Sequence, residues 1–219
     1  ALLKDSAPGS DHQLAFASQL VSAIDTPAGA TLLKAWLKGE EVPEGLEVDA
    51  DMRWRITCAL ARMGAIGEAE IAAEAERDQT ITGQEYAAGA RSALRDPKAK
   101  AEAWRLATED PNVPNGTHSA ICSWFWSYGA TDILADYADK YLAVTRQISA
   151  GEGIWAKAGH AATQHVLLGL FPAPVADSTF LTKVTEQIND EAISDQVRRV
   201  LREQKDAAER SLRCQEFSA

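Results

Sequence analysis

The feature that most constrains the fold is the spacing of helix signals between residues 51 and 114. Helical apolar periods alternate there with short turns, marked by Gly64, by Asp78–Thr80, by Pro97 and by Pro114. Apolar residues at three- and four-residue spacing indicate amphipathic helices, and Thr, Gly and Pro mark where such helices begin and end. Helices joined by turns this short run antiparallel to their neighbours. The segment therefore predicts stacked antiparallel helix pairs.

The same periods continue on both sides of this segment. We predict helices over about 11–24 and after Pro27, continuous helices over 132–149 and 155–170, and a charged final helix over about 190–213. Alanine dominates the apolar residues, and β-branched and aromatic residues are modest in number, which favours helix over strand. The predicted fold is all-α: a curved stack of antiparallel helix pairs, that is, a HEAT-like helical-repeat solenoid.

The chain length and its first residues suggest how the chain is divided. The 219 residues suit one large domain with a sizeable core. The chain begins with Ala rather than Met, and we interpret it as a piece of a longer polypeptide. We assign residues 1–10 to a linker from a missing upstream domain, residues 11–215 to a single helical-repeat domain and residues 216–219 to a tail.

Composition argues against several classes of partner. The chain has 22 basic and 32 acidic residues, a net charge of −10, so it repels phosphate backbones and we expect no nucleic acid partner. No apolar run is long enough to cross a bilayer, and no signal pattern is present, so we expect no membrane and a cytoplasmic location. Cys58, Cys122 and Cys214 are odd in number and lack metal spacing, which favours buried or idle thiols.

No pattern of catalytic or metal-binding residues emerges. His160 and His165 are five residues apart, which puts them about 140° apart around a helix rather than on one face. We interpret His165 as a polar core or surface residue. Motifs of zinc peptidases, serine hydrolases and nucleotide-binding loops are absent from the sequence. We therefore predict no catalytic residue, no metal ligand and no cofactor in this chain, which alone should be inactive. An enzyme using an acidic pair is a further alternative.

The most aromatic segment, residues 115–128, has two interpretations. It could form a ligand-facing wall, or a helix whose Ile121, Trp124, Phe125 and Tyr128 belong to the core, and the second is favoured.

Removal of a partner domain would leave apolar groups exposed. We expect them near the N-terminal helices, around Leu2, Leu3 and Phe16, with the aromatic turn Trp124–Tyr128 as a second place.

Several short segments together carry a resemblance to a known family. In chain order they are Asp51-Met-Arg-Trp-Arg55, Ala69-Glu-Ile-Ala-Ala-Glu74, Asp78-Gln-Thr-Ile-Thr-Gly83, Lys100-Ala-Glu-Ala-Trp104, Pro114-Asn115, Tyr137-Ala-Asp-Lys-Tyr141, Gly169-Leu-Phe-Pro172 and Glu209-Arg-Ser-Leu-Arg-Cys-Gln215. In this order and spacing the chain, from about Leu14 to Gln215, resembles the C-terminal helical domain of bacterial aminopeptidase N, and most of all its actinobacterial branch.

The resemblance implies a function that depends on a missing part. In that family a helix with the H-E-x-x-H motif holds the catalytic zinc in an upstream thermolysin-like domain. The resemblance thus implies a non-catalytic C-terminal domain of a zinc metallo-aminopeptidase, a hydrolase that releases N-terminal amino acids from peptides. Such a domain caps the active site and shapes peptide access. Its partners would be the upstream catalytic domain of the same chain, which would hold the zinc, and the peptide substrate.

Two points remain open. The alternative function is a free-standing helical-repeat scaffold for protein interaction, and an upstream H-E-x-x-H motif would discriminate the two. The residues predicted to face a peptide groove are Arg53, Arg55, Asn115 and His118. For the arginines the competing interpretation is a structural salt bridge.

Overall fold

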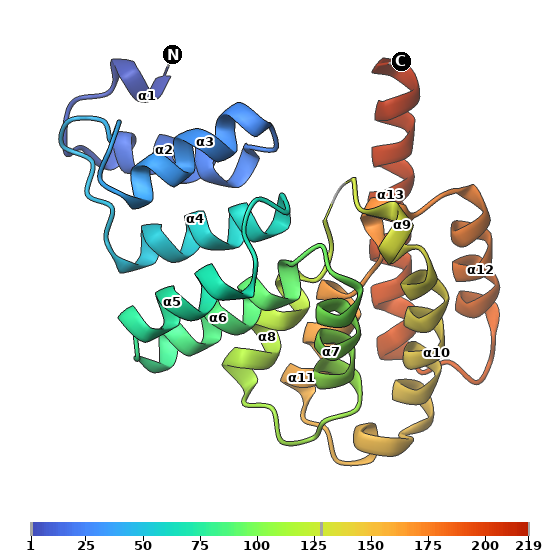
Figure 1. Cartoon of the computed structure of the whole chain (residues 1–219). Coiled ribbons are helices and arrows are strands. Elements are labelled where there is room, and N and C mark those ends of the chain that lie inside the picture. The colour runs from blue at the N-terminus through green and yellow to red at the C-terminus, as the bar shows by residue number, and fades with distance from the viewer. Residues whose placement is uncertain (1, 128, 219) are drawn as a thin grey trace. The chain divides into compact units, whose positions relative to one another are not determined.

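The computed structural model describes residues 2–127 and 129–218, and all the regular elements among them are helical. The all-α prediction and the packed helix pairs are confirmed. The chain divides into two compact units, residues 1–95 (unit 1) and residues 96–219 (unit 2), which are described separately (Figure 1). The curvature of the stack and its likeness to HEAT repeats stay predictions.

Unit 1 consists of regular helices with side-chain caps at most of their starts. Its elements are α1 (Leu2–Asp5), α2 (Asp11–Ala23), α3 (Pro27–Leu37), α4 (Ala50–Arg62), α5 (Glu68–Arg77) and α6 (Ile81–Ala93). Ser10, Thr26, Asp49 and Thr80 each accept a hydrogen bond from the backbone amide three residues later, which satisfies an amide that a helix start leaves free. Gly64 ends the turn after α4 with a φ of +68°, as the sequence predicted.

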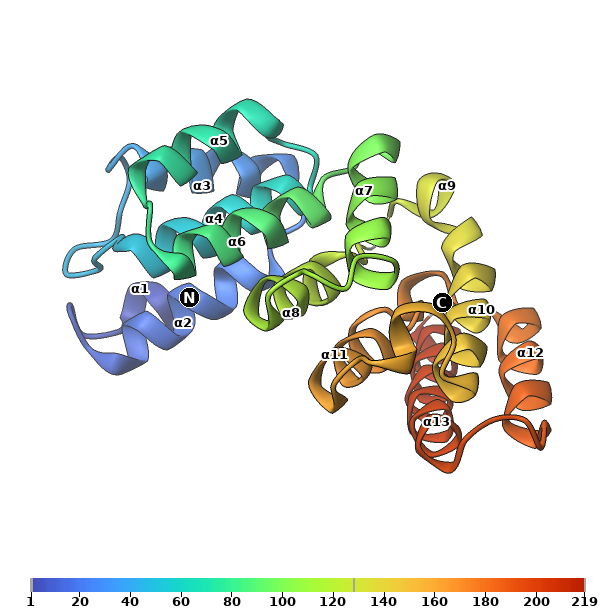
Figure 2. The same cartoon turned by 90° about the horizontal axis from the view of Figure 1, so that it is seen from below.

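Helix α4 is the centre of unit 1. It contacts α2, α3 and α6, and α5 packs on α6 (Figure 2). Its apolar side is completely buried at Ile56 and Leu60, where it meets Leu33 and Trp36 of α3. The loop that follows α3 is fixed by the Trp36 indole, whose Nε1 donates to the Glu41 carbonyl at 3.1 Å. Unit 1 is thus organised around one buried helix.

Unit 2 is less regular. Its elements are α7 (Pro97–Thr108), α8 (Asn115–Trp124), α9 (Thr131–Leu134), α10 (Asp136–Ala150), η1 (Gly153–Ala156), α11 (His160–Gln164), η2 (His165–Gly169), η3 (Ala173–Val175), α12 (Ser178–Asn189) and α13 (Asp195–Ser218). The core contains two aromatic groups. Trp104, Phe125 and Tyr137 pack together, and Phe171 lies between Tyr141 and Phe180. Helix α13 continues past the end of α12 (Figure 1).

Three helix predictions in unit 2 were wrong in detail. The helix predicted over 132–149 is interrupted at Ala135. The one predicted over 155–170 consists of the 3₁₀ helix η1, the short α-helix α11 and the π-helical η2. An extended Gly159 separates η1 from α11, and the Leu167 carbonyl accepts a hydrogen bond from the buried Tyr141 hydroxyl at 2.8 Å. The last helix begins at 195 rather than near 190, because Asp190 first forms a turn.

The predicted domain boundaries remain predictions. The range 1–10, assigned to a linker, contains α1, and Leu3 packs against the unit 1 core. The range 216–219, assigned to a tail, overlaps α13, which is described to Ser218.

Candidate functional site

Arg53 is a half-buried residue with a structural role. Its Nε and Nη2 donate to the two carboxylate oxygens of Glu74 on α5, at 2.6 and 2.5 Å, and its Nη1 donates to the Leu37 carbonyl at 2.9 Å. The two side chains are only 16% and 10% exposed. The hydrogen bonds to Glu74 raise the pKa of Arg53 despite its burial. The competing interpretation, a salt bridge between helices, describes Arg53.

Arg55, two residues later, is held but remains accessible. Its Nε donates to Asp51 at 2.5 Å, and its side chain is 44% exposed. The other oxygen of Asp51 accepts a hydrogen bond from the Tyr86 hydroxyl, also at 2.5 Å. Burial opposes ionisation of Asp51, but the hydrogen bonds from Tyr86 and Arg55 outweigh it and lower its pKa. Within residues 2–127 and 129–218 no partner accepts from the Nη atoms of Arg55, so they remain free to bind.

Tyr86 is fixed from two directions. Its ring stacks on that of Trp54, with centroids 6.1 Å apart and planes 8° apart. Burial and the hydrogen bond to Asp51 raise the pKa of Tyr86 to about 12, so the phenol stays protonated and keeps donating. Trp54 in turn donates from Nε1 to Asp78 at 2.8 Å. The position of Arg55 is therefore set by the exposed Asp51, which the half-buried Tyr86 and the buried Trp54 hold in turn.

The two candidates on α8, Asn115 and His118, also differ in their exposure to solvent. Asn115 is the first residue of α8 and is exposed, and the preceding Pro114 provides no side-chain cap. His118, one turn later, is only 4% exposed. Asn115 and Arg55 are therefore accessible to a ligand, whereas His118 and Arg53 are engaged inside their units.

His118 lies at the contact between α8 and η2. Its Nε2 is 2.9 Å from the Ala107 carbonyl of α7, and its Nδ1 is 3.2 Å from the Nδ1 of His165. About one turn further along the same contact, Gly169 approaches α8 so closely that a Cβ there would lie 2.9 Å from the Cβ of Cys122. We call the contact formed by His118, Cys122, His165 and Gly169 the α8–η2 seam.

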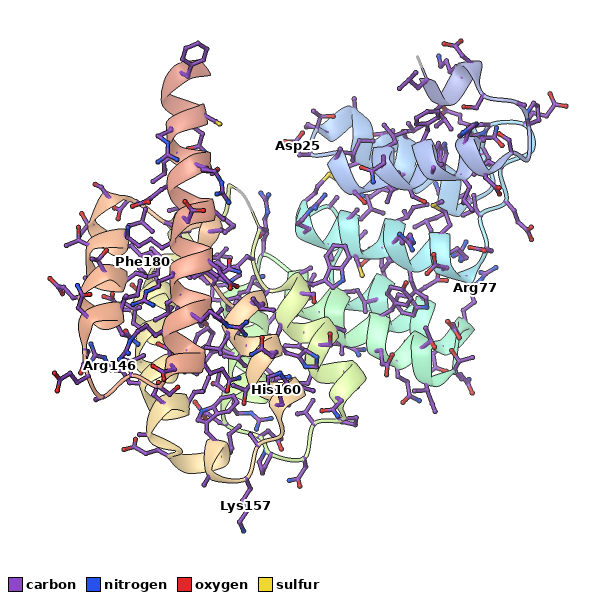
Figure 3. The ribbon with its side chains drawn as sticks, turned by 180° about the vertical axis from the view of Figure 1, so that it is seen from behind. Asp25, Arg77, Arg146, Lys157, His160 and Phe180 are labelled. Atoms are coloured by element: carbon purple, nitrogen blue, oxygen red, sulfur yellow. The ribbon has the colours of Figure 1, made fainter. Side chains whose placement is uncertain are left out.

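The sequence did not indicate this pairing. We compared His165 with His160, its neighbour in the chain, whereas its partner His118 lies 47 residues earlier. His160 is exposed at the start of α11 (Figure 3). Burial lowers the pKa of His118 and outweighs the hydrogen bond to the Ala107 carbonyl, which raises it. Burial, together with the nearby His118, also lowers the pKa of His165. The prediction of a polar core or surface residue fits the half-buried His165.

The aromatic segment belongs to the core at the residues that can be placed. Ile121 and Phe125 are 1% and 0% exposed, which supports the core interpretation, and Trp124 is partly buried. Tyr128 lies outside the described residues. The ammonium of Lys100, also fully buried, donates to the Phe125 carbonyl and lies 5.0 Å from the ring centroid. A ligand-facing wall is not observed at Ile121 and Phe125.

The expected exposure of apolar groups holds in part. Leu2 is 65% exposed, and Leu14 on α2 is 50% exposed. Leu3 and Phe16 are partly buried instead.

Two shallow grooves lie elsewhere. One, of about 350 Å³, separates α12 from α13 and includes Leu181, Thr185, Lys205 and Arg213; the other, of about 420 Å³, lies beside α3 and includes Asp25, Thr31, Lys34 and Met63. The four predicted groove residues line neither.

The described residues offer little for metal or thiol chemistry. No group of three or more His, Cys, Asp or Glu residues among them could hold a metal ion. Cys58 and Cys122 are buried, which raises the pKa of each thiol to about 12, whereas Cys214 is exposed. Among the same residues no helix is both long and apolar enough to cross a membrane.

Comparison with known proteins adds a family. Residues 3–210 match the family model described as the ERAP1-like C-terminal domain. The whole chain of 219 residues is 35% identical to a part of aminopeptidase N from Streptomyces lividans. It spans 25% of the length of that relative.

Proposed function

From the premise that this chain belongs to the ERAP1-like C-terminal domain family and is a C-terminal domain of the aminopeptidase N family, we propose that it caps the active site of a zinc-dependent aminopeptidase. In that role it shapes which peptides reach the catalytic domain. The observation that carries the proposal is the 35% identity to an aminopeptidase N over the whole length of this chain.

The proposal assigns catalysis to a partner. The described His, Cys, Asp and Glu residues form no group that fits a zinc ion, so no catalytic step is assigned to this chain. The upstream catalytic domain of the same chain would hold the zinc and release N-terminal amino acids from peptides. A cytoplasmic location stays part of the proposal.

Within this role we assign peptide contact to Arg55 and Asn115. The free Nη atoms of Arg55 can donate to a peptide carbonyl or carboxylate, and the Nε bond to Asp51 orders the guanidinium before binding. Asn115 offers an exposed amide at the start of α8. Arg53 and His118 support the fold, since each would have to leave a partner before it could bind a peptide.

The test uses the aminopeptidase that contains this chain and two neighbouring variants. We expect Arg55→Ala to raise KM for peptides several residues long and to leave hydrolysis of an amino-acid anilide unchanged, because the anilide is too short to reach this domain. The matched variant Arg53→Ala should instead lower the melting temperature. If KM for long peptides is the same in Arg55→Ala and wild type, the assignment of Arg55 fails.

A second measurement tests the capping role itself. The catalytic domain is compared with and without this chain on peptides and on a folded protein with an accessible N-terminus. Capping predicts that the folded protein is cleaved faster when this chain is absent. Equal selectivity in both forms would favour the free-standing interaction scaffold instead.

A further inference from the structure

We propose that His118 and His165 form a proton-sensitive clasp that fastens η2 to α8 and opens in mild acid. This inference concerns the fold of unit 2 and does not depend on the proposed function. It follows from the positions of three ring nitrogens and of one carbonyl oxygen.

The hydrogen bonds determine which nitrogen carries each proton. The Ala107 carbonyl can only accept, so the Nε2 of His118, 2.9 Å away, must be an N–H donor. A neutral imidazole has one N–H, so the Nδ1 of His118 is then an acceptor. The Nδ1 of His165, 3.2 Å away, must therefore carry the second proton. The chain of donors runs from His165 through His118 to Ala107, with both rings neutral.

This arrangement tolerates one added proton but not two. A proton on the Nε2 of the half-buried His165 leaves the bond between the two rings intact. A proton on the Nδ1 of His118 removes the only acceptor, and two N–H groups then face each other across 3.2 Å. The two positive rings would also repel each other in a site where His118 is 4% exposed. The second proton therefore opens the seam.

Other ionisable groups around the pair do not replace this effect. The nearest titratable group is the thiol of Cys122, whose Sγ lies 4.0 Å from the Nδ1 of His118 and which burial keeps neutral. Charged side chains on the packed elements α7, α11 and α13 are engaged with other groups: Arg105 with Glu102, Lys100 with the Phe125 carbonyl, His160 with Gln196, Arg198 with Asp195, Lys205 with Glu209 and Arg210 with Asp206. The shifts of the two histidine pKa values come from burial, the Ala107 carbonyl and the pair itself.

The direction of the pH effect follows from these shifts. Both histidines have folded-state pKa values below their ordinary 6.5. Well above pH 6.5 both are neutral in the folded and unfolded chain, and the full stability is present. As the pH falls below 6.5 the unfolded chain binds protons first, so the free energy of unfolding decreases until the pH has passed the folded pKa values.

Local geometry makes η2 the segment that opens when the histidine pair is protonated. It is a single π-helical segment, and such turns lack the regular hydrogen bonds of an α-helix. Besides His165, the seam is held by the close approach of Gly169 to Cys122, and η2 is anchored from the other side by the Tyr141 hydroxyl. We expect the backbone from His165 to Gly169 to open while α12 and α13 stay folded.

The first experiment needs no substitution. Long-range proton–nitrogen NMR of the 219-residue chain at pH 7.5 reports the tautomer of each histidine. We expect His118 with its proton on Nε2 and His165 with its proton on Nδ1. The opposite tautomer at either ring would overturn the proposed donor chain.

The second experiment follows hydrogen exchange of the η2 amides between pH 7 and pH 5, corrected for intrinsic rates. In the wild type we expect protection to fall severalfold as the pH passes below the ordinary histidine pKa. In His165→Asn the side-chain amide can donate to His118 from the same position but cannot be protonated. Only the buried His118 then titrates, without a second positive ring beside it, so protection should fall much less than in the wild type. His160→Asn, on the neighbouring exposed histidine, is the control and should behave as the wild type. Equal loss of protection in His165→Asn and wild type would refute the clasp.

Discussion

The two units stabilise their helices by different means. In unit 1, side chains at the helix starts cap their own helices, and pairs such as Arg53–Glu74 connect neighbouring helices. In unit 2, buried side chains cross to the backbone of another element: His118 to Ala107, Lys100 to Phe125 and Tyr141 to Leu167. Most helix starts in unit 1 are therefore set by nearby residues, as are those of α7 and α12 in unit 2, which Asp96 and Asp177 cap. The irregular segments of unit 2 depend instead on residues far away in the chain.

The largest expected effect is at the Arg53–Glu74 pair. Arg53→Ala leaves the carboxylate of Glu74, 10% exposed, without its two hydrogen bonds, and we expect a loss of about 3 kcal/mol in the free energy of unfolding. Urea unfolding followed by circular dichroism measures it. The control is Arg55→Ala, whose exposed pair with Asp51 should contribute less than about 1 kcal/mol. Similar losses in the two variants would contradict the distinction between them.

Two glycine substitutions compare close contacts in the two units. A Cβ at Gly83 of α6 would lie 2.3 Å from the Asp78 carbonyl oxygen, whereas one at Gly169 would lie 2.9 Å from the Cβ of Cys122. We expect each Ala variant to lose about 1–3 kcal/mol, Gly83→Ala more than Gly169→Ala, because a backbone oxygen at the shorter distance has to move. Thermal unfolding of both variants measures the order. A larger loss in Gly169→Ala would show that the seam is packed more rigidly than α6.

The importance of helix caps in unit 1 can be measured at Thr80. Its Oγ1 accepts from the Gly83 amide at 3.0 Å, so Thr80→Ala should cost about 1 kcal/mol. Thr80→Ser retains the hydroxyl and is the control. If the Ser variant loses as much as the Ala variant, packing of the methyl group rather than capping holds this turn.

The smallest effect is expected at the surface of unit 2. Arg146 (Figure 3) pairs with Asp190 at 2.9 Å, but the two side chains are 55% and 33% exposed. Arg146→Ala should change the free energy of unfolding by less than about 1 kcal/mol. A loss as large as that of Arg53→Ala, measured by the same urea unfolding, would mean that unit 2 also depends on its surface pairs.

The same contrast explains what could be predicted from the sequence. The turns at Gly64 and at Asp78–Thr80 depend on residues within a few positions, so the sequence indicated them. The interrupted helices of unit 2 have strong apolar periods, and only contacts such as Tyr141 with Leu167 show where the α-helical hydrogen bonds give way.

The residues of the candidate site show the same difference between local and distant interactions. The type and spacing of Arg53 and Arg55 suggested a role for both, but the sequence did not show that Glu74, 21 residues later, engages the first. Likewise nothing near His118 in the chain pointed to His165. Pairings across long sequence separations were the part that could not be foreseen.

The buried cysteines give each unit its own chemical reporter. Cys58 in unit 1 and Cys122 in unit 2 are 0% and 1% exposed, and their raised thiol pKa values leave almost no reactive thiolate at neutral pH. An alkylating reagent can therefore modify Cys58 only when unit 1 opens and Cys122 only when unit 2 opens, while the exposed Cys214 is open to reagent in the folded chain. Peptide mass spectrometry of one labelling time course would thus follow the opening of the two units separately, without any substitution.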